Sequence, residues 1–437
     1  MNRTLSRSTF PFAILLLASL VIGAACGSFG AASDPPTATP PADIDAVVQL
    51  WNSLSETTAS PEDNTIVEVW NSLSQDFVEK DDLDSQELSQ AAIDAMLEFQ
   101  SDSQNKPDPE LLAQAAINGM LDALGDPYST FLNPDQYALY AEDSQGKFEG
   151  IGARVDLINS RLTIIEPMPN TPAEMAGIEA GDVILEVDGA STEGWSLIES
   201  VIKIRGPEDS TVRLLVQHKN AGEPVVIEIV RSVIDLESIS WEMLPGEIVY
   251  FELSTFADNT DEILADALKE IGELGAQGMV LDLRNNLGGL LSTTINVASQ
   301  FLNDGLVLYA VDGDGHRTDY EVKSDGAAQD IPLVVLVNQF SASASEVLSG
   351  ALQDHERAIL IGTTTFGKGS VNLPKRLNNG SGLYFTIGRW YSPNGRLIEG
   401  EGLEPDILVE AGIADDEDPQ LEKALEYLIT QVAATSR

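Results

Sequence analysis

Three short stretches of this sequence carry residues that could perform nucleophilic chemistry. In the first, SASASE, the serines Ser341, Ser343 and Ser345 follow the apolar run PLVVLVN and open a predicted helix. A serine at a helix N-terminus commonly caps the helix, and this is the structural alternative. One cap needs only one serine, however. A nucleophile at this place would lie beside backbone N–H groups that can stabilise an oxyanion.

The second stretch, TTTFGKGS, supplies a candidate general base, Lys368. It lies between two glycines directly after the apolar run AILIG, so its backbone can approach the ends of neighbouring strands. A lysine base must be neutral, so its pKa must fall by about three units from ~10.4, which burial can cause. A structural glycine-rich loop is the alternative. His355 is a weaker candidate base, because the sequence has no G-x-S-x-G motif and His355 lies in a polar turn.

The third stretch is DLRNNLGG, in which a predicted strand ends at 282–284 and Gly288 and Gly289 follow. Ligands bind at the carboxyl ends of strands in α/β sheets, and glycines there allow a backbone N–H to face an oxyanion. A left-handed turn before a helix is the alternative. A separate S-x-x-K match, Ser200 with Lys203, resembles a penicillin-binding motif, but the S-D-N and K-T-G motifs that accompany it are missing.

The elements that would position these residues follow from the hydrophobic pattern. From about residue 237, nearly continuous apolar runs alternate with helix-like stretches, and a last helix is predicted at about 418–434. This alternation is typical of a layered α/β core with buried strands. Residues 146–235 instead show short alternating strands between Gly, Pro and Asp turns, with two short helices. That pattern indicates a small, partly open barrel.

Residues 44–145 have a helical pattern with an internal repeat. WNSLSE recurs as WNSLSQ, and AAIDAM recurs as AAINGM. Two copies are too few for a solenoid, so we expect a local duplication of helices whose apolar faces serve core or oligomer packing. The segment 125–136, GDPYSTFLNPDQ, is rich in turn residues and is expected to end this region.

Composition narrows the possible chemistry. The chain has 437 residues, with 70 acidic against 24 basic side chains, a formal charge of −46, three histidines and one cysteine. The negative charge argues against a nucleic-acid partner, because neutralising phosphates requires clustered Lys and Arg. So few His and Cys residues argue against a Cys/His metal site, and we expect no metal and no other cofactor. The length predicts two to four domains.

The N-terminal residues are typical of an export signal. An apolar run from Phe10 to Ile22 follows two arginines and precedes Gly-Ala-Ala and Cys26. Because the run is too short to span a bilayer comfortably, residues 1–25 predict a secretory signal peptide. Cys26 is a candidate for lipidation, with an unmodified exported protein as the alternative, and residues 26–43 predict a Pro/Ala-rich tether. We expect an extracytoplasmic protein, periplasmic or at the cell surface, that contacts a membrane only through this lipid anchor.

Taken together, the motifs of residues 65–412 resemble those of the carboxyl-terminal processing peptidases, also called tail-specific proteases. GDPYSTFL resembles the segment before the family's PDZ domain, and FEGIGARV and PAEMAGIEAGDVILEVDG resemble that domain. DLRNNLGG, SASASE, FGKGSV and RWYSPNGRLIEGEGLEPDI resemble the protease core. The resemblance implies an α/β protease core with a ClpP/crotonase-like layered β-α arrangement at 236–437. It also implies an inserted PDZ domain at 146–235 after the N-terminal helical region.

The resemblance also implies roles for individual residues. The nucleophile would be Ser343, and its general base would be Lys368, 25 residues later. The backbone amides of Gly289 and Ala344 would stabilise the oxyanion. The implied activity is that of a serine endopeptidase that cleaves exported or membrane-associated proteins near their C-termini without a cofactor.

Two further positions bear on this activity. Asp354 matches a family aspartate that supports activity through structure. The family places a Gln four residues after the lysine to orient it, and here that position holds Asn372. Asn keeps the amide but is one methylene shorter, so either the loop shifts or another acceptor orients Lys368. The departure leaves open a second function, a catalytically impaired PDZ scaffold or regulatory binding protein.

The PDZ-like segment implies the partners. The backbone N–H groups of Gly150, Ile151, Gly152 and Ala153 would bind the free C-terminal carboxylate of a protein or peptide substrate, which would add as a strand to the domain. A homodimer through the N-terminal helices is the other expected assembly.

Overall fold

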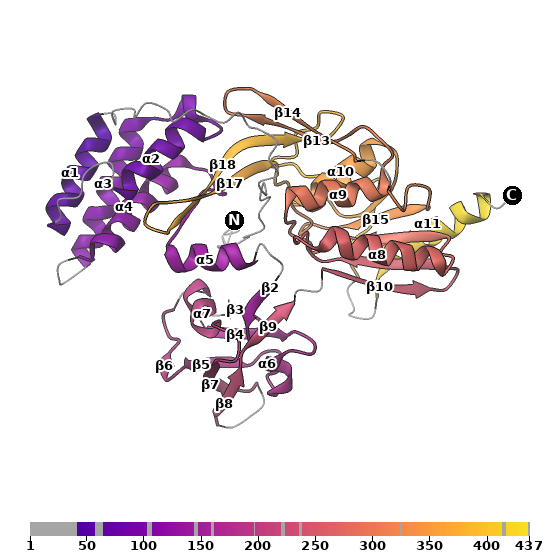
Figure 1. The fold of residues 1–437 in the computed structure, drawn as a ribbon, viewed down its shortest axis with the longest axis horizontal. Helices are drawn as coiled ribbons and strands as arrows, with labels where there is room; N and C mark the ends of the chain where they lie inside the picture. Colours follow the sequence, from indigo (N-terminus) through magenta and orange to yellow (C-terminus); the bar gives the residue numbers. More distant parts are fainter. Residues whose placement is uncertain are drawn as a thin grey trace, which may run out of the picture.

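The computed structural model describes residues 42–56, 64–102, 107–143, 147–158, 161–195, 197–219, 223–235, 238–323, 326–412 and 417–435. The expected signal peptide, the lipidation candidate Cys26 and nearly all of the tether lie outside the described residues. Figure 1 shows three groups of elements: a bundle of helices from the N-terminal region, a small domain of strands, and a larger α/β body.

The predicted helical region forms a bundle at the end of a sheet. Its helices are α1 (Ala42–Ser55), α2 (Thr65–Asp76), η2 (Lys80–Asp82), α3 (Ser85–Asp102) and α4 (Pro109–Leu124). The start of α4 follows from its sequence, since Asp108 accepts a hydrogen bond from Glu110 N at 2.8 Å and Pro109 occupies the first helical position. Gly125 ends the helix in the left-handed conformation, with φ of 71°.

The internal repeat is reflected in the packing of this bundle. Trp51 and Trp70, which are equivalent in the repeat, are both buried in the same core, as are Met96 and Met120. Helices α3 and α4 approach closely at Gly119, where an added Cβ would lie 2.6 Å from a backbone oxygen of α3. The repeated residues therefore serve helix packing, as the pattern predicted.

The segment 125–136 contains more regular structure than its turn-rich sequence indicated. It holds the strand β1 (Thr130–Leu132) and the start of helix α5 (Pro134–Asp143). Strand β1 pairs antiparallel with β18 (Gly382–Tyr391), with Thr130 opposite Tyr384. The turn residues predicted a boundary, but the three residues TFL find a partner strand that lies some 250 positions away. This segment therefore joins the helical bundle to the α/β body.

The small domain is the expected partly open barrel. Its strands are β2 (Lys147–Gly150), β3 (Ala153–Ile158), β4 (Arg161–Pro167), β5 (Val183–Val187), β6 (Ala190–Ser191), β7 (Thr211–Gln217), β8 (Val225–Val230) and β9 (Ser232–Asp235), with helices α6 (Pro172–Met175) and α7 (Leu197–Ile204). The first and last strands, β2 and β9, pair with each other. The chain therefore enters and leaves the domain at one place, as an inserted domain must.

The α/β body is built on a six-stranded sheet with the order β10-β11-β12-β15-β16-β19. Its strands are β10 (Ile239–Leu244), β11 (Ile248–Leu253), β12 (Gly278–Asp282), β15 (Leu333–Val337), β16 (Ile359–Gly362) and β19 (Ile407–Leu408). All pairs are parallel except β10 with β11. Every residue of β12 and β15 is buried, as continuous apolar runs predict for strands covered on both faces.

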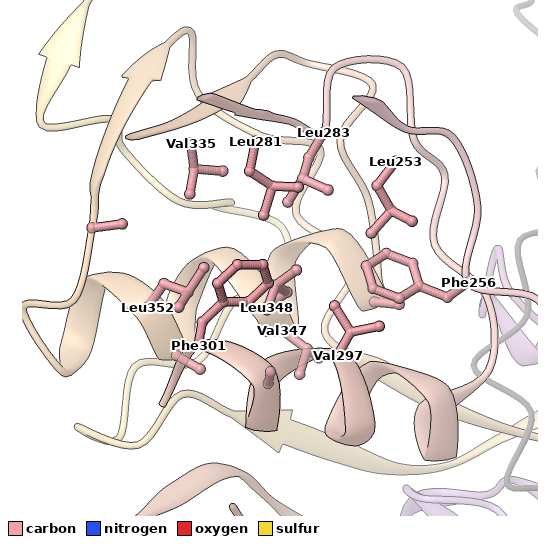
Figure 2. Close-up of a cluster of buried hydrophobic side chains, with 14 of the residues drawn as sticks. Leu253, Phe256, Leu281, Leu283, Val297, Phe301, Val335, Val347, Leu348 and Leu352 are labelled. Atoms are coloured by element: carbon pink, nitrogen blue, oxygen red, sulfur yellow. The ribbon is translucent and has the colours of Figure 1, made fainter. Parts of the chain in front are cut away.

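Helices cover the two faces of this sheet because alternate side chains point in opposite directions. Leu281 of β12 packs in a cluster with residues of α8 (Thr260–Glu273), α9 (Leu291–Phe301) and α10 (Ala344–Asp354). Its neighbour Val280 packs instead with Leu428 of α11 (Pro419–Thr435). Figure 2 shows the first cluster, in which Val347 and Leu348 of α10 lie with Phe301 below the strands. This packing fixes the N-terminal end of α10 against the sheet.

A second sheet lies between the α/β body and the helical bundle (Figure 1). It has the strand order β1-β18-β13-β14, with β17 paired to β18. The strands not yet given are β13 (Leu306–Asp312), β14 (Arg317–Glu321) and β17 (Ser370–Arg376). Leu383 and Phe385 of β18 belong to the apolar core of the bundle. Strand β17 begins directly after Lys368 and Gly369, so the second sheet carries the candidate base.

Candidate active site

The three serines of SASASE have different environments. Ser341 donates its hydroxyl to Leu283 O, and Ser345 donates to Asn286 O, each at 2.8 Å. Ser343 lies between them and is fully buried, yet its Oγ has no hydrogen-bond partner among the described residues. The outer serines therefore hold the turn to the DLRNNLGG loop, whereas the hydroxyl of Ser343 is left available.

Ser343 also has an unusual backbone conformation. It stands between strand β15 and helix α10 with φ of 54° and ψ of −114°. A serine at a positive φ is strained, and such strain persists only where the surrounding structure enforces it, often at active sites. The turn presents the residue at the N-terminus of α10, where the N–H groups of Ser345 and Glu346 donate to Ala342 O and Ser343 O, whereas that of Ala344 has no acceptor among the described residues. The sequence therefore builds a sharp strand-to-helix turn around one free hydroxyl.

A buried glutamate connects Ser343 to Lys368. Glu346 Oε2 accepts the backbone N–H of Ser343 at 2.9 Å and that of Lys368 at 2.8 Å. Its other oxygen, Oε1, accepts Thr365 Oγ1 at 2.6 Å and Gly367 N at 2.7 Å. Burial raises the pKa of Glu346, and these four hydrogen bonds oppose that change. Two N–H groups that share one oxygen must be close neighbours, so Glu346 holds the two candidate residues together.

Lys368 lies in an environment that suits a base. Its side chain is buried, and its Nζ lies 5.3 Å from the ring centre of Tyr128 and 5.9 Å from that of Tyr384. Burial lowers the pKa of Lys368 to about 8, although the carboxylates of Glu399, Asp126 and Glu346 act in the opposite direction. A substantial fraction of the amine is therefore neutral near pH 8, as general-base chemistry requires.

Gly288, the first glycine of the pair in DLRNNLGG, lies directly against Ser343, and Gly289 follows it against Phe256. A Cβ added to Gly288 would be 2.9 Å from both Ser343 Cβ and Ala344 N. The N–H of Gly288 donates to Asn286 Oδ1 at 2.8 Å. By contrast, the N–H groups of Gly289 and Ala344 have no acceptor within the part of the chain that the structure describes. Two unpaired N–H groups beside the free hydroxyl form an arrangement that can bind an oxyanion.

Asn372 is fully buried in a polar network of its own. Its Nδ2 donates to Thr386 Oγ1 at 3.0 Å and to Tyr128 O at 3.3 Å, while its Oδ1 accepts Ser370 Oγ at 2.9 Å. Thr386 in turn donates to Asp126 Oδ2 at 2.6 Å. Both amide hydrogens of Asn372 are thus engaged, one with the Tyr128 carbonyl and one with Thr386, which binds Asp126. Asn372 therefore supports the segment that carries the Tyr128 ring.

Asp354 lies at the far end of α10 from Ser343. It accepts Asn394 N at 2.8 Å and forms an ion pair with Arg396. These contacts tie the end of the helix to the turn that follows β18. His355, next to it, is half-buried rather than exposed, and its Nε2 lies 2.8 Å from Leu306 O. Both residues support the fold at a distance from the free hydroxyl.

The residues predicted to bind a C-terminal carboxylate form a corner between β2 and β3. Gly150 ends β2, paired with Ser232, and Ala153 begins β3. Between them, the carbonyls of Ile151 and Gly152 accept Ala173 N and Met168 N, at 2.8 and 2.9 Å. The N–H groups of Ile151 and Gly152 have no acceptor among the described residues. Gly152 has φ of 74°, which allows this reversal of the chain.

Two groups of His and acidic side chains lie away from this site. Glu179, Asp182 and His218 form one, and three residues of the β13–β14 turn form the other. Asp182 is engaged with His218 Nδ1 at 2.9 Å and with Glu179 N at 2.8 Å, so its carboxylate has a structural role. Neither group includes a residue of the three motifs around Ser343 and Lys368.

Several residues of this site were not identified from the sequence. Tyr128 and Asp126 belong to the GDPYST segment and come close to Lys368 only because β1 pairs with β18. Glu399 lies in the long loop before β19 and accepts Gly369 N at 2.8 Å. Glu346 could have been found, because S-x-x-E at 343–346 has the spacing of a helix capping box.

No helix among the residues that the structure describes is both long and apolar enough to cross a bilayer.

The family model for peptidase family S41 matches residues 247–409, and the PDZ-domain model matches residues 141–217. A carboxy-terminal-processing protease of Bartonella bacilliformis is 38% identical over 312 residues, which are 70% of this chain and 71% of that protein.

A carboxyl-terminal-processing protease of Synechocystis is 37% identical over 330 residues, covering 73% of this chain and 77% of that protein. A solved photosystem II D1 C-terminal processing protease aligns with a TM-score of 0.54 and 30% identity, covering 80% of this chain and 94% of that one. These findings confirm the resemblance read from the motifs and the predicted fold class. The chain therefore belongs to the carboxyl-terminal-processing serine proteases of peptidase family S41 and carries a PDZ domain.

Proposed function

We propose that this protein cleaves polypeptides near their C-termini with Ser343 as nucleophile and Lys368 as general base. The observation that carries the proposal is the pair of contacts to Glu346 Oε2, which joins the backbone of a free, buried serine to that of a buried lysine. The lowered pKa of Lys368 supports its role as a base. The unpaired N–H groups of Gly289 and Ala344 support their role as oxyanion donors.

The reaction follows from this arrangement. Neutral Lys368 accepts the proton of Ser343 Oγ as that oxygen attacks the scissile carbonyl carbon, and the N–H groups of Gly289 and Ala344 donate to the developing oxyanion. When the tetrahedral intermediate collapses, the ammonium group returns the proton to the leaving amine. Lys368 then deprotonates a water molecule that attacks the acyl-enzyme, and the proton passes back to Ser343. The cycle leaves the enzyme unchanged and consumes one water.

The PDZ domain accounts for selection of C-termini. The N–H groups of Ile151 and Gly152 would bind the terminal carboxylate, with Gly150 and Ala153 shaping the corner, and the peptide would add as a strand beside β3. We propose protein substrates outside the cytoplasm, because residues 1–25 have the pattern of a secretory signal. Lipidation at Cys26 would keep the enzyme at a membrane.

A homodimer through the N-terminal helices is a further part of this proposal. Leu97 of α3 and Leu111 of α4 are exposed apolar side chains, about half accessible, on the helical bundle. Sedimentation of the protein without residues 1–25 should give the mass of a dimer. Monomeric behaviour at micromolar concentration would contradict this part of the proposal alone.

The proposal is tested with a fluorogenic peptide that ends in a free carboxylate. We expect Ser343→Ala and Lys368→Ala each to lower kcat at least ~10⁴-fold, since removal of one member of a catalytic pair usually removes most of its effect. Ser349→Ala is the control, because Ser349 is also buried in α10 with an unpartnered hydroxyl. A chelator should leave the rate unchanged.

Two outcomes would overturn this assignment. If Ser343→Ala and Lys368→Ala retain the wild-type rate, the catalytic pair is elsewhere. If the wild-type protein binds peptides through the PDZ domain but cleaves none, the alternative of a PDZ scaffold on an inactive core is favoured.

A further inference from the structure

Glu399 approaches Lys368 from a part of the chain that the proposed mechanism does not use. It lies in the loop between β18 and β19, and its Oε2 accepts Gly369 N at 2.8 Å. The two backbones are in direct contact, because a Cβ added to Gly369 would lie 2.5 Å from Glu399 N. The half-buried side chain of Glu399 is therefore held beside the residue that follows the candidate base.

Three carboxylates raise the pKa of Lys368 and so favour its charged form: Glu399, Asp126 and Glu346. Glu346 accepts four hydrogen bonds, and Asp126 accepts the hydroxyls of Ser129 and Thr386 and the N–H of Tyr128. Glu399, by contrast, accepts only one hydrogen bond within the described residues. Its charge is the least compensated of the three by nearby donors, and its effect on Lys368 is the largest.

The remaining groups around this pair are aromatic or cationic. Tyr128 and Tyr384 present their rings to Lys368 Nζ, and burial raises the pKa of Tyr128 to about 12, so its phenol stays neutral. Burial raises the pKa of Glu399, and Asp126 adds to this effect, whereas Arg389 of β18, the N–H of Gly369 and Lys368 act to lower it. Arg389 is itself paired with Glu79 at 3.1 Å. By acting to lower this pKa, Arg389 favours the ionised form of Glu399.

We propose that Glu399 is a positioning residue that stabilises the ammonium form of Lys368 and so sets the pH range in which the enzyme works. This inference rests on the proposed role of Lys368 as base. When Lys368 takes the proton of Ser343 Oγ, a positive charge forms in a buried place, and the Glu399 carboxylate compensates it until the proton moves to the leaving amine. Glu399 gains no proton in this step, so the transfer stays between Ser343, Lys368 and the leaving group.

The sign of the effect on pH dependence follows directly. The base must be neutral, so kcat/KM rises with pH through the pKa of Lys368, about 8. A negative charge nearby favours the ammonium form and raises that pKa, so removing the charge lowers it. The Glu399→Gln variant should therefore reach its plateau at lower pH than the wild type. The plateau itself should be lower, because a weaker base transfers the proton less readily.

The experiment compares pH profiles of kcat/KM for three proteins. Glu399→Gln keeps an oxygen that can accept Gly369 N, so it removes the charge with little change of shape. We expect the midpoint of the acidic limb of its kcat/KM profile to shift to lower pH by about half a unit or more. Glu401→Gln is the matched control, because Glu401 is an exposed glutamate of the same loop. Its profile should coincide with that of the wild type. An unmoved limb in Glu399→Gln would overturn the inference.

A second measurement does not depend on turnover. In protein labelled with ¹³C at the lysine ε-carbon and carrying Ser343→Ala, the Lys368 signal is identified by its loss in Lys368→Met. Its titration midpoint should fall when Glu399→Gln is added, and an unchanged midpoint would also overturn the inference. If wild-type activity survives Ser343→Ala or Lys368→Ala, the proposed function fails instead. The titration of Lys368 would still report whether Glu399 acts on it.

Discussion

The α/β body and the PDZ domain each contain a glycine corner with unpaired backbone N–H groups. In the body, Gly289 and Ala344 leave two N–H groups free beside Ser343, and in the PDZ domain Ile151 and Gly152 leave two free between β2 and β3. Both corners can bind a negatively charged oxygen. One would bind an oxyanion that exists only during reaction, and the other a carboxylate that the substrate always carries.

The difference lies in what supports each corner. The corner at Ser343 is backed by strands that are buried over their whole length and by Glu346, which has no exposed surface. The corner at Gly152 rests on a single small domain, whose strand β8 has mostly exposed or half-exposed residues. A transition state gains most from donors that do not have to move, whereas a carboxylate can be captured by a site that adjusts. Strands that are buried over their whole length thus stand behind the corner where the charge is transient.

The largest effect in this comparison is expected for the body. Gly289 has φ of 149°, and a Cβ there would lie 2.4 Å from Phe256 O. In Gly289→Ala the backbone must shift and carry the N–H away from the oxyanion. We expect kcat to fall ~10²- to 10³-fold with little change in KM, measured with the fluorogenic peptide. Gly275→Ala is the control, since Gly275 also has a positive φ of 79° but nothing within 4 Å. Equal kcat values in both variants would contradict the role of this corner.

A smaller and different effect is expected for the PDZ corner. A Cβ on Gly152 would lie 2.4 Å from Thr171 Cβ, so Gly152→Ala should distort the carboxylate site. We expect KM to rise ~10-fold for peptides with a free C-terminus, while peptides with an amidated C-terminus should be cleaved as by the wild type. Gly177→Ala is the control, because Gly177 has φ of 81° and open space around it. If the variant loses kcat on both peptides alike, the two corners do not have separate functions.

The smallest effect is expected at Asn372. Asn372→Gln introduces the side chain that the resemblance implies at this position, but the position is fully buried, and the Asn372 amide already binds Thr386, Ser370 and the Tyr128 carbonyl. An extra methylene in a packed interior costs ~1–3 kcal/mol of unfolding free energy. We therefore expect a modest loss of stability and a kcat/KM within about fivefold of the wild type. A large gain in activity would instead indicate that Asn372 limits catalysis, and would sharpen the case for an impaired enzyme.

The sequence predicted the layered core, the inserted domain and the family, because their motifs are local and long enough to recognise. No physical argument from the sequence shows which of the three serines in SASASE has a hydroxyl without a hydrogen-bond partner. Ser341, Ser343 and Ser345 look alike in a pattern, and only the Leu283 and Asn286 carbonyls distinguish them. Partners that come from other strands cannot be read from the spacing of the serines themselves.

The residues that surround Lys368 could not be predicted from the sequence either. Tyr128 precedes the lysine by 240 positions, and their contact depends on the pairing of a three-residue strand. His355 lies among polar neighbours in the sequence, but its close approach to Gly305, where a Cβ would lie 2.6 Å from the imidazole ring, leaves it half-buried. Pairing over long distances and backbone contacts of this kind leave little trace in local composition.

The pairing of β1 with β18 has a practical consequence for any shortened version of this protein. A fragment that begins at residue 236 would contain both Ser343 and Lys368, yet it would lack Thr130–Leu132 and the Tyr128 ring. The backbone of β18 near Tyr384 would lose one neighbour and expose an unpaired strand edge, and Leu383 and Phe385 would lose the apolar core of the helical bundle. Such a fragment is expected to aggregate. The unit that folds and the segment that sequence comparison delimits are therefore different lengths of chain.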